Sequence, residues 1–229
     1  MSITYITHCR IVDGAGNPAI ENATLKIEGD KIVQIGMVDD FGAFESQARV
    51  IDLEGATLLP GLGNMHAHLG LSFPFPRRRV ALETPVERAF RCARQAKNAL
   101  EAGVTSIRCV GEWEGIDIDL RDAIAQGLVE GARIFSAGSA VIATGGHGHN
   151  SLSCVEASGA DGFLQAAREQ LKRGADLIKL CITGGIGTPG EHFSSSQITR
   201  EEMQAALWVA HEAGKHLAVH AGGDAASQL

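Results

Sequence analysis

Two histidines one residue apart are the sharpest chemical feature of the sequence. His66-Ala67-His68 lies at the end of an apolar segment that predicts a strand over residues 57–65. Residues i and i+2 of a strand point to the same face, so both imidazoles are expected to aim in one direction. Two neutral imidazoles suit a borderline-soft divalent metal such as zinc. Two polar residues in a surface loop give the same pattern, so the pair alone is a weak signal.

A lysine in an apolar strand is the second feature. Lys179 lies in the middle of the predicted strand 176–182. A lysine there is costly unless it is paired or neutralised. One interpretation is an ordinary lysine that reaches solvent or a neighbouring carboxylate. The other is a neutral amine with a lowered pKa, which can add carbon dioxide and become a carbamate. The two anionic oxygens of a carbamate could bridge two metals.

Two further histidines follow predicted strands. His220 ends the predicted strand 216–220, and His147 lies in the glycine-rich loop 145–149 after the third strand of the predicted sheet. A single such histidine is usually a core or loop residue. Potential ligands at the ends of three parallel strands are harder to attribute to chance. We interpret His147 as a substrate contact, with a solvent-exposed loop histidine as the alternative.

The elements that must position these residues change in character at Pro60. Residues 3–59 read as short strands, among them a hairpin that turns at Glu28-Gly29-Asp30. After Pro60, strands alternate with helices. Thr84 with Glu87, and Thr199 with Glu202, form capping boxes that predict two helix starts. We therefore expect a β module over residues 1–59 and about five β/α units over residues 60–229.

This alternation predicts an α/β fold, a parallel sheet with helices outside. A doubly wound open sheet competes with a (β/α)8 TIM barrel, but no glycine-rich dinucleotide or phosphate fingerprint follows any strand. The expected fold is therefore a TIM barrel, with about five of its eight units present. On this interpretation the 229 residues are the N-terminal part of a longer protein or one piece of a split one.

Composition excludes several classes of protein. The net charge is −7 and no basic stripe is visible, so we expect no nucleic-acid partner. No apolar run of about 18 residues predicts a membrane span. The five cysteines are scattered and form no C-x-x-C pair. Free thiols in a reducing compartment are the better interpretation, so the expected location is the cytoplasm.

The segment from Leu58 to His68 resembles the first-strand signature of the amidohydrolase superfamily, although members commonly carry an acidic residue where Asn64 stands. Further matches appear in the expected order, at residues 101–106, 144–148, 174–179 and 218–221. The set is similar to the imidazolonepropionase-like branch, which includes prolidase-like and Xaa-Arg or Xaa-Lys dipeptidases. The resemblance covers essentially the whole chain, and residues 1–59 look like the N-terminal part of the family's accessory β-sandwich.

The resemblance implies a role for each candidate residue. His66 and His68 would hold the more buried of two divalent metal ions, zinc being the expected metal. Lys179, carboxylated by carbon dioxide, would bridge both metals, and His220 would hold the second. His147 would contact the substrate. The family also uses a histidine after the sixth strand and an aspartate after the eighth as general base, and both positions would fall beyond residue 229.

The implied activity is metal-dependent hydrolysis of an amide bond in a small molecule, a dipeptide or a cyclic amide. Lactone or organophosphate hydrolysis on the same fold is one alternative. A non-catalytic, truncated fragment is another, because the general base is expected outside the chain. The complete protein is expected to be a homo-oligomer, or a partner chain is expected to supply the rest of the barrel.

Overall fold

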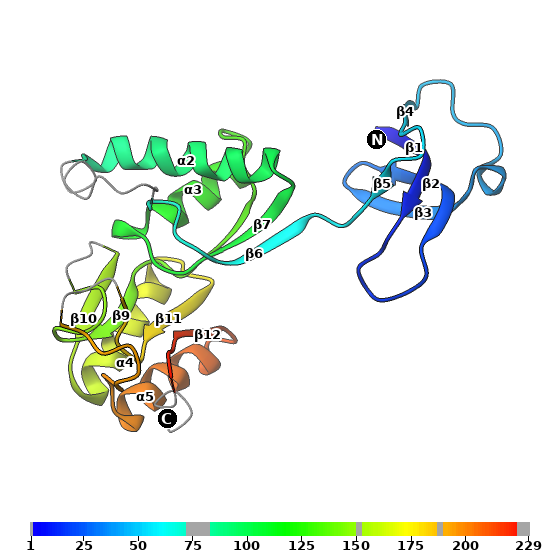
Figure 1. Ribbon diagram of the computed structural model, residues 1–229. Coiled ribbons are helices and arrows are strands. Elements are labelled where there is room, and N and C mark those ends of the chain that lie inside the picture. Colours follow the sequence, from blue (N-terminus) through cyan, green and yellow to red (C-terminus); the bar gives the residue numbers. More distant parts are fainter. Residues whose placement is uncertain (1, 72–82, 150–152, 187–189, 224–229) are drawn as a thin grey trace. The chain divides into compact units, whose positions relative to one another are not determined.

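The computed structural model describes residues 2–71, 83–149, 153–186 and 190–223. The chain forms two compact units, Met1–Gly61 and Leu62–Leu229, which are described separately (Figure 1). None of the helices in these ranges combines the length and the apolar character needed to cross a membrane.

The first unit is a mixed β-sheet. Its strands are β1 (Ile3–Ile11), β2 (Ile20–Glu28), β3 (Lys31–Met37), β4 (Arg49–Asp52) and β5 (Thr57–Leu58), with a short 3₁₀ helix, η1 (Val38–Phe41), after β3. The sheet order is β3-β2-β1-β4, and β5 also pairs with β1. β2 and β3 pair antiparallel from Glu28 and Lys31, so the predicted hairpin is confirmed. A small core centred on Cys9, Ile11 and Leu25 holds the sheet together.

The predicted single strand over residues 57–65 is wrong. β5 ends at Leu58, and β6 (Leu62–Ala67) begins the second unit. Between them lie Leu59-Pro60-Gly61. Proline has no backbone N–H to donate to a ladder, and glycine weakens a strand, so the chain leaves one sheet here and enters the other. As a result His66 lies inside β6, and His68 follows its end.

The second unit contains parallel strands and helices in alternation (Figure 1). Its elements are β6, α2 (Pro85–Glu101), β7 (Val104–Cys109), η2 (Trp113–Gly115), α3 (Ile116–Ala125), β8 (Arg133–Ser136), β9 (Ala140–Ala143), β10 (Cys154–Ala157), α4 (Gly159–Lys172), β11 (Leu177–Cys181), α5 (Arg200–Glu212) and β12 (His216–His220). Both predicted capping boxes are present, with Thr84 accepting from the Glu87 N–H and Thr199 from the Glu202 N–H.

The strand order decides between the two α/β architectures. β6, β7 and β8 pair in parallel, and β9, β11 and β12 do the same. The backbone N–H of Asp176 donates to the Ser136 carbonyl (2.7 Å), which ties the start of β11 to the end of β8. Apart from the short β10, which pairs with the other side of β9, the strands follow one another in sequence order. A doubly wound sheet reverses its order at a switch point, so this arrangement is part of a barrel that the described residues do not close.

The third predicted strand is followed by two strands that were not predicted. The strand expected over residues 132–137 is confirmed as β8, but a separate strand, β9, begins at Ala140 and was not predicted. Gly138 between them has φ +65°, a conformation that interrupts a strand and suits glycine. β10 was not predicted, because four residues carry too little periodicity to reveal a strand. The helix expected from Asp119 begins earlier, at Ile116.

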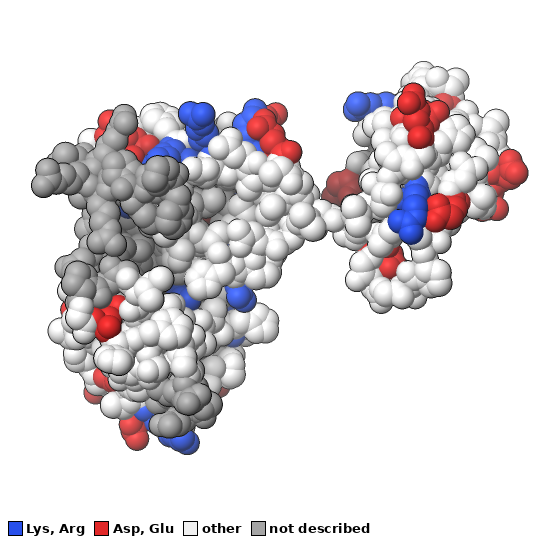
Figure 2. Space-filling model, viewed as in Figure 1, with Lys and Arg blue, Asp and Glu red and all other residues white. Residues whose placement is uncertain are grey.

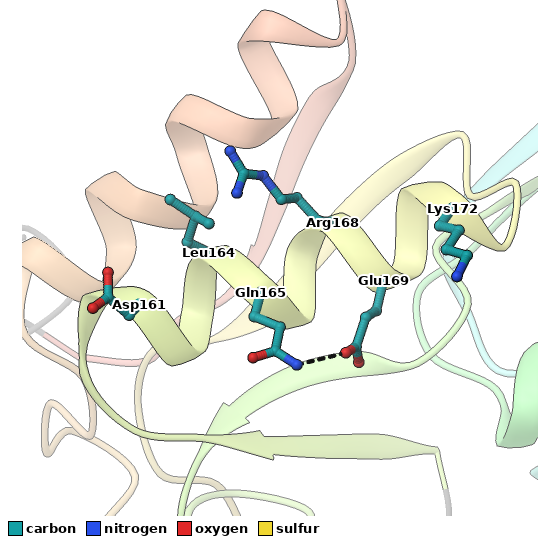
Figure 3. A pocket seen from close by; sticks show the side chains of 6 residues that line it. All are labelled: Asp161, Leu164, Gln165, Arg168, Glu169 and Lys172. Carbon is teal, nitrogen blue, oxygen red and sulfur yellow. Dashed lines mark hydrogen bonds between the residues drawn. The ribbon is translucent and has the colours of Figure 1, made fainter.

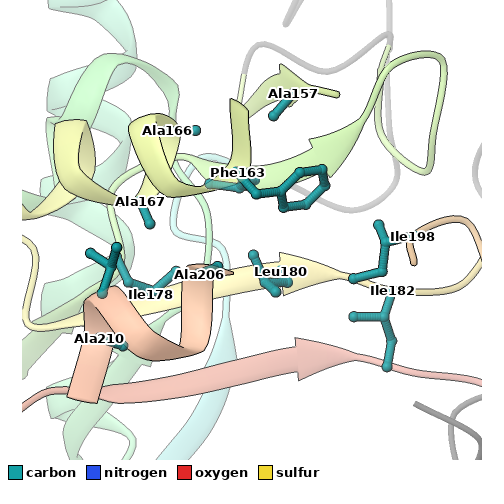
Figure 4. Packing of buried hydrophobic residues seen from close by; sticks show 12 residues of the cluster. Ala157, Phe163, Ala166, Ala167, Ile178, Leu180, Ile182, Ile198, Ala206 and Ala210 are labelled. Carbon is teal, nitrogen blue, oxygen red and sulfur yellow. The ribbon is translucent and has the colours of Figure 1, made fainter. Parts of the chain in front are cut away.

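Apolar packing lies between the strands and their covering helices. Phe163 and Ala167 of α4, together with Ala206 of α5, pack against Ile178 and Leu180 of β11 (Figure 4). A second cluster joins α2 and α3 to β7 and β8 through residues such as Cys92 and Ile107. Because the helices cover one face of the strands, side chains of opposite parity point to the other, inner face.

Candidate functional site

The inner face of the sheet receives the four predicted ligands. Ala67 packs against the apolar cluster on the helix side of β6 and β7. Its neighbours His66 and His68 therefore point to the opposite, inner face. On β11, Ile178 and Leu180 face the helices, which leaves Lys179 on the inner face. Leu217 of β12 packs toward α4 and α5, and His220 therefore also faces inward. Three strands thus bring their predicted ligands to one face, near their carboxyl ends.

The two histidines of the first barrel strand lie side by side. The ring centroids of His66 and His68 are 5.5 Å apart. Nδ1 of His68 donates to the carbonyl oxygen of Gly111 (2.9 Å), in the loop after β7. This hydrogen bond fixes the ring and leaves Nε2 with a lone pair, the arrangement usual for a metal-binding histidine. His66 is more exposed, and its backbone N–H donates to the Asn64 side-chain oxygen (3.1 Å).

Lys179 is almost completely buried. It is 2% exposed, in a strand of which every residue is buried. Burial lowers its pKa, and the charge of Arg108 adds to the effect, whereas Cys181 and Cys154 oppose it. The shift favours the neutral amine, which is the form that adds carbon dioxide. The lysine is therefore not a surface residue that reaches solvent.

His220 is held at the end of β12. Its Nε2 donates to the Gly184 carbonyl oxygen (3.2 Å), which lies after β11. The neighbouring turn is fixed as well, since the Gly222 N–H donates to the hydroxyl of the fully buried Thr183 (2.9 Å). As at His68, one ring nitrogen binds a backbone carbonyl and the other remains available for a ligand.

His147 joins this group from the loop after β9. Its ring stacks on that of His220, with centroids 4.3 Å apart and planes inclined by 16°. Nδ1 of His147 is 2.8 Å from a carboxylate oxygen of Glu191. The backbone N–H of His147 donates to the Gln197 side-chain oxygen (2.8 Å). The loop is therefore anchored against the segment between β11 and α5.

The electrostatics of the site favour neutral imidazoles. Burial first, and then the charges of Lys179 and neighbouring histidines, lower the pKa of His66 to about 4. Burial also lowers the pKa values of His68 and His220, and the Lys179 charge contributes to both. These mutual effects show that the side chains lie within electrostatic reach of one another. Neutral imidazole is the protonation state that binds a metal.

The group is not closed into a coordination sphere in the structure. Within the described ranges, no three side chains among His, Cys, Asp and Glu lie close enough together to hold a metal ion. Lysine is not among these ligand types, although a carboxylated Lys179 would add two oxygens. The donor set nevertheless fits a divalent metal, since His68 and His220 each keep one nitrogen available and each ring is oriented through the other.

Three charged residues around the site were not predicted. Glu112 is 2% exposed and accepts a hydrogen bond from the Gly70 N–H (2.7 Å), two residues after His68. Arg108, on the inner face of β7, donates to the Met65 carbonyl (2.6 Å). Glu191 holds His147. Glutamate and arginine in loops and strand ends are common, so the sequence contains no spacing that would single out these three.

A surface hollow on α4 is separate from this site. Its volume is about 510 Å³, and it is lined by residues of α4 alone: Asp161, Leu164, Gln165, Arg168, Glu169 and Lys172 (Figure 3). These side chains carry charges of both signs and lie on the outward face of α4, whereas the candidate ligands lie on the opposite side of the strands. In the view of Figure 2, basic side chains likewise lie among acidic ones and do not merge into one positive surface.

Comparison with known proteins shows that the chain belongs to the amidohydrolase family. The sequence profile of the Amidohydrolase family matches residues 57–228, which include β5 and the second unit almost to its end. Ochratoxinase from Aspergillus niger is 26% identical over 97% of this chain and 51% of its own length. The chain therefore spans about half the length of the curated relatives it matches.

Solved structures agree in fold. A Xaa-Pro dipeptidase with methionine bound in its active site is 30% identical, with a TM-score of 0.87 over 96% of this chain and 57% of that one. A prolidase from Bifidobacterium longum, assigned in its description only provisionally, is 26% identical, with a TM-score of 0.81 over 99% and 51%. The A. niger ochratoxinase structure reaches a TM-score of 0.86 at 23% identity, over 99% of this chain and 57% of that one, which shows the fold alone.

Proposed function

Because the chain belongs to the amidohydrolase family, we propose that the protein containing it hydrolyses amide bonds in dipeptides or cyclic amides, with two divalent metal ions at the inner face of the barrel strands. One observation carries the proposal. His66, His68, Lys179 and His220 come from three different strands and share one face, where the imidazoles are neutral and the lysine is buried.

The residues present fit such a metal centre. His66 and His68 would hold one metal and His220 the other, with carboxylated Lys179 between them. Carboxylation adds carbon dioxide to the neutral amine and releases one proton, so the product is an anion with two ligand oxygens. Divalent metal ions, when bound, activate a water molecule near neutral pH and polarise the scissile carbonyl. Zinc suits these ligands, and so do manganese and cobalt.

The chain's own residues have distinct tasks in this scheme. Hydrogen bonds to Gly111 and Gly184 orient the rings of His68 and His220 before any metal binds. Buried surroundings keep Lys179 in the form that reacts with carbon dioxide. His147, beside His220, would hydrogen-bond the substrate. One further group is needed to take a proton from the attacking water and deliver it to the leaving nitrogen. This group is expected to be an aspartate outside these residues.

The substrate class rests on similarity. The structure named as a Xaa-Pro dipeptidase is 30% identical to this chain across nearly its whole length. The sequence similarity to an ochratoxinase is lower but covers the same range. Xaa-Pro dipeptides are therefore the first substrates to test. Xaa-Arg and Xaa-Lys dipeptides come next, and lactones and organophosphates represent the alternative chemistries on the same fold.

The test begins with metal content. Elemental mass spectrometry of the full-length protein, purified without added metal, should give about two divalent ions per chain, as binuclear hydrolases hold. The loaded protein should hydrolyse a Xaa-Pro or related dipeptide faster than a lactone or a phosphotriester. Absence of bound metal would contradict the metal centre. If the protein holds metal but hydrolyses only lactones or phosphotriesters, the proposed amide substrate class is contradicted.

A further inference from the structure

The imidazole of His147 is in close contact with two neighbouring residues, His220 and Gly185. One face stacks on the ring of His220 at 4.3 Å between centroids. Gly185 also lies against the ring, since an added Cβ there would overlap the imidazole atoms. A larger residue at position 185 would therefore displace the imidazole of His147. The ring contacts both a candidate metal ligand and a backbone segment that immediately follows the lysine strand.

Glu191 fixes the edge of the same ring. Its side chain is 6% exposed, and one carboxylate oxygen accepts from Nδ1 of His147 (2.8 Å) and from the Gly185 N–H (3.0 Å). The other oxygen is 3.5 Å from the Gln197 amide nitrogen, a longer contact. Burial opposes ionisation of Glu191, but the hydrogen bonds from His147 and Gly185 outweigh it and lower its pKa.

These contacts define which nitrogen of His147 carries the proton. A carboxylate only accepts hydrogen bonds, so Nδ1 must be the donor. In the neutral ring, Nε2 then has a free lone pair. Among the described residues, no hydrogen bond reaches Nε2 of His147. This nitrogen is therefore the one available to a bound molecule.

We propose that Glu191 is a positioning residue, which sets the ring orientation and the Nδ1–H tautomer of His147 so that Nε2 meets the substrate beside His220. This inference rests on the proposed function, because it assumes that the substrate binds at the inner face. It assigns to the segment between β11 and α5 a part in the reaction, through Gly185, Glu191 and Gln197. None of these residues is among the predicted metal ligands.

The first experiment reads the tautomer without any reaction. Long-range ¹H–¹⁵N NMR spectra of the full-length protein with ¹⁵N-labelled histidine report which ring nitrogen is protonated, and His147→Gln assigns the signal. The wild-type protein should show Nδ1–H at His147. Glu191→Gln, which keeps an oxygen acceptor, should retain it. Glu191→Ala should shift the ring toward Nε2–H. An unchanged tautomer in Glu191→Ala would overturn the proposal.

The second experiment is a double-mutant cycle on dipeptide hydrolysis. Glu191→Ala should lower kcat/KM by about 10- to 100-fold, the usual cost of losing a partner that orients a histidine. Glu191→Gln should recover much of this loss. In a His147→Ala background, Glu191→Ala should cost little more, because the two residues act as a unit. An equal loss in both backgrounds would mean that Glu191 acts only on the fold, and it would refute the proposal.

The loop itself provides the matched control. Glu156 accepts from the Gly145 N–H (2.8 Å), so it holds the backbone of the same loop without contacting the imidazole. Glu156→Ala should change kcat/KM by less than about three-fold, as expected of an exposed residue away from the reacting groups. A loss equal to that of Glu191→Ala would show that loop anchoring alone matters. If the wild-type protein hydrolyses no amide, the proposed function fails, while the tautomer experiment still tests the positioning role.

Discussion

Strands β6 and β11 of the second unit hold their candidate ligands in different ways. In β6, five of six residues are exposed, whereas all five residues of β11 are buried. Lys179 is therefore fixed by packing on both sides of its strand. His66 and His68 are fixed by hydrogen bonds, to Asn64 through the backbone and to Gly111 through the ring. Substitutions near β6 should change function more than stability, and substitutions in β11 should change both.

The largest effect is expected at Lys179. Lys179→Met keeps the length of the side chain and removes the amine, so bridging of two metals is lost and kcat/KM should fall by at least about 100-fold. Stability should hold, because an apolar side chain suits this buried position. Kinetics, metal content and thermal melting check these outcomes. Lys172→Met on exposed α4 is the control, and near-full activity of Lys179→Met would refute the proposed metal centre.

Packing around the same strand gives the next effect. Leu180→Ala removes a fully buried side chain between β11 and its covering helices, and the free energy of unfolding should fall by about 2–5 kcal/mol. Phe90→Ala on α2 removes a larger side chain that is 72% exposed, and it should change the free energy by less than about 0.5 kcal/mol. Urea unfolding measures both. Equal losses would mean that β11 is no better packed than the surface.

The residues that follow β7 should give a pH dependence opposite in sign to that of Lys179 in β11, whose lowered pKa favours the folded state as the pH rises. Burial raises the pKa of Glu112 to about 7 and that of Asp117 to about 6. Both groups ionise at lower pH in the unfolded chain, so the unfolded state loses its protons first. The contribution of these two groups to the free energy of unfolding should be highest below about pH 4 and fall until about pH 7, whereas His66, whose pKa is lowered to about 4, contributes in the opposite direction. At about 1.4 kcal/mol per pKa unit, Glu112 alone accounts for about 3 kcal/mol.

Urea unfolding of the wild-type protein and of two variants at pH 5, 6 and 8 isolates this contribution as the difference between their curves. Glu112→Gln removes the titrating group and keeps an acceptor for the Gly70 N–H, so its free energy of unfolding should increase relative to that of the wild type between pH 5 and pH 8. Asp117 keeps one carboxylate oxygen buried without a hydrogen-bond partner, so Asp117→Asn should flatten the lower part of the curve. An unchanged slope in both variants would mean that other groups cause the dependence.

Helix starts should give the smallest effects, of equal size at both ends. Thr84 and Thr199 each accept from the backbone N–H three residues on, at 3.2 Å in both cases. Replacing either with alanine should cost about 1 kcal/mol, because one N–H group in the first turn of the helix loses its acceptor. Thermal melting of Thr84→Ala and Thr199→Ala checks this. A much larger loss in one variant would show that its helix carries more of the fold's stability.

Features with a local cause could be predicted from the sequence. The hairpin at Gly29 and the helix starts at Thr84 and Thr199 depend on residues within a few positions of one another. The alternation of side chains along a strand would also put Lys179 on the face opposite Ile178 and Leu180, as the structure has it. The change in character at Pro60 was predicted, but one strand was still expected over residues 57–65, because an apolar run continues on both sides of the proline. Proline and glycine within that run were the signal that could have revealed it.

Features that depend on distant contacts could not be predicted. Glu191 meets His147 across 44 residues, and Glu112 meets Gly70 across 42. Nothing in either local sequence separates these glutamates from surface ones. Their burial becomes evident only when neighbouring barrel units pack side by side. The four candidate ligands were found because strand ends of a parallel sheet share one edge, a rule that needs no knowledge of the loops.

The sequential order of the strands has a thermodynamic consequence. β6 and β12 are the outer strands of the barrel run, and the candidate ligands lie on both. Two ions, one held on β6 and one on β12 with carboxylated Lys179 of β11 between them, would link the first and last units of the described barrel run. Each tenfold excess of free metal over its dissociation constant would then add about 1.4 kcal/mol to the stability of the fold. The free energy of unfolding would therefore increase with the concentration of free metal.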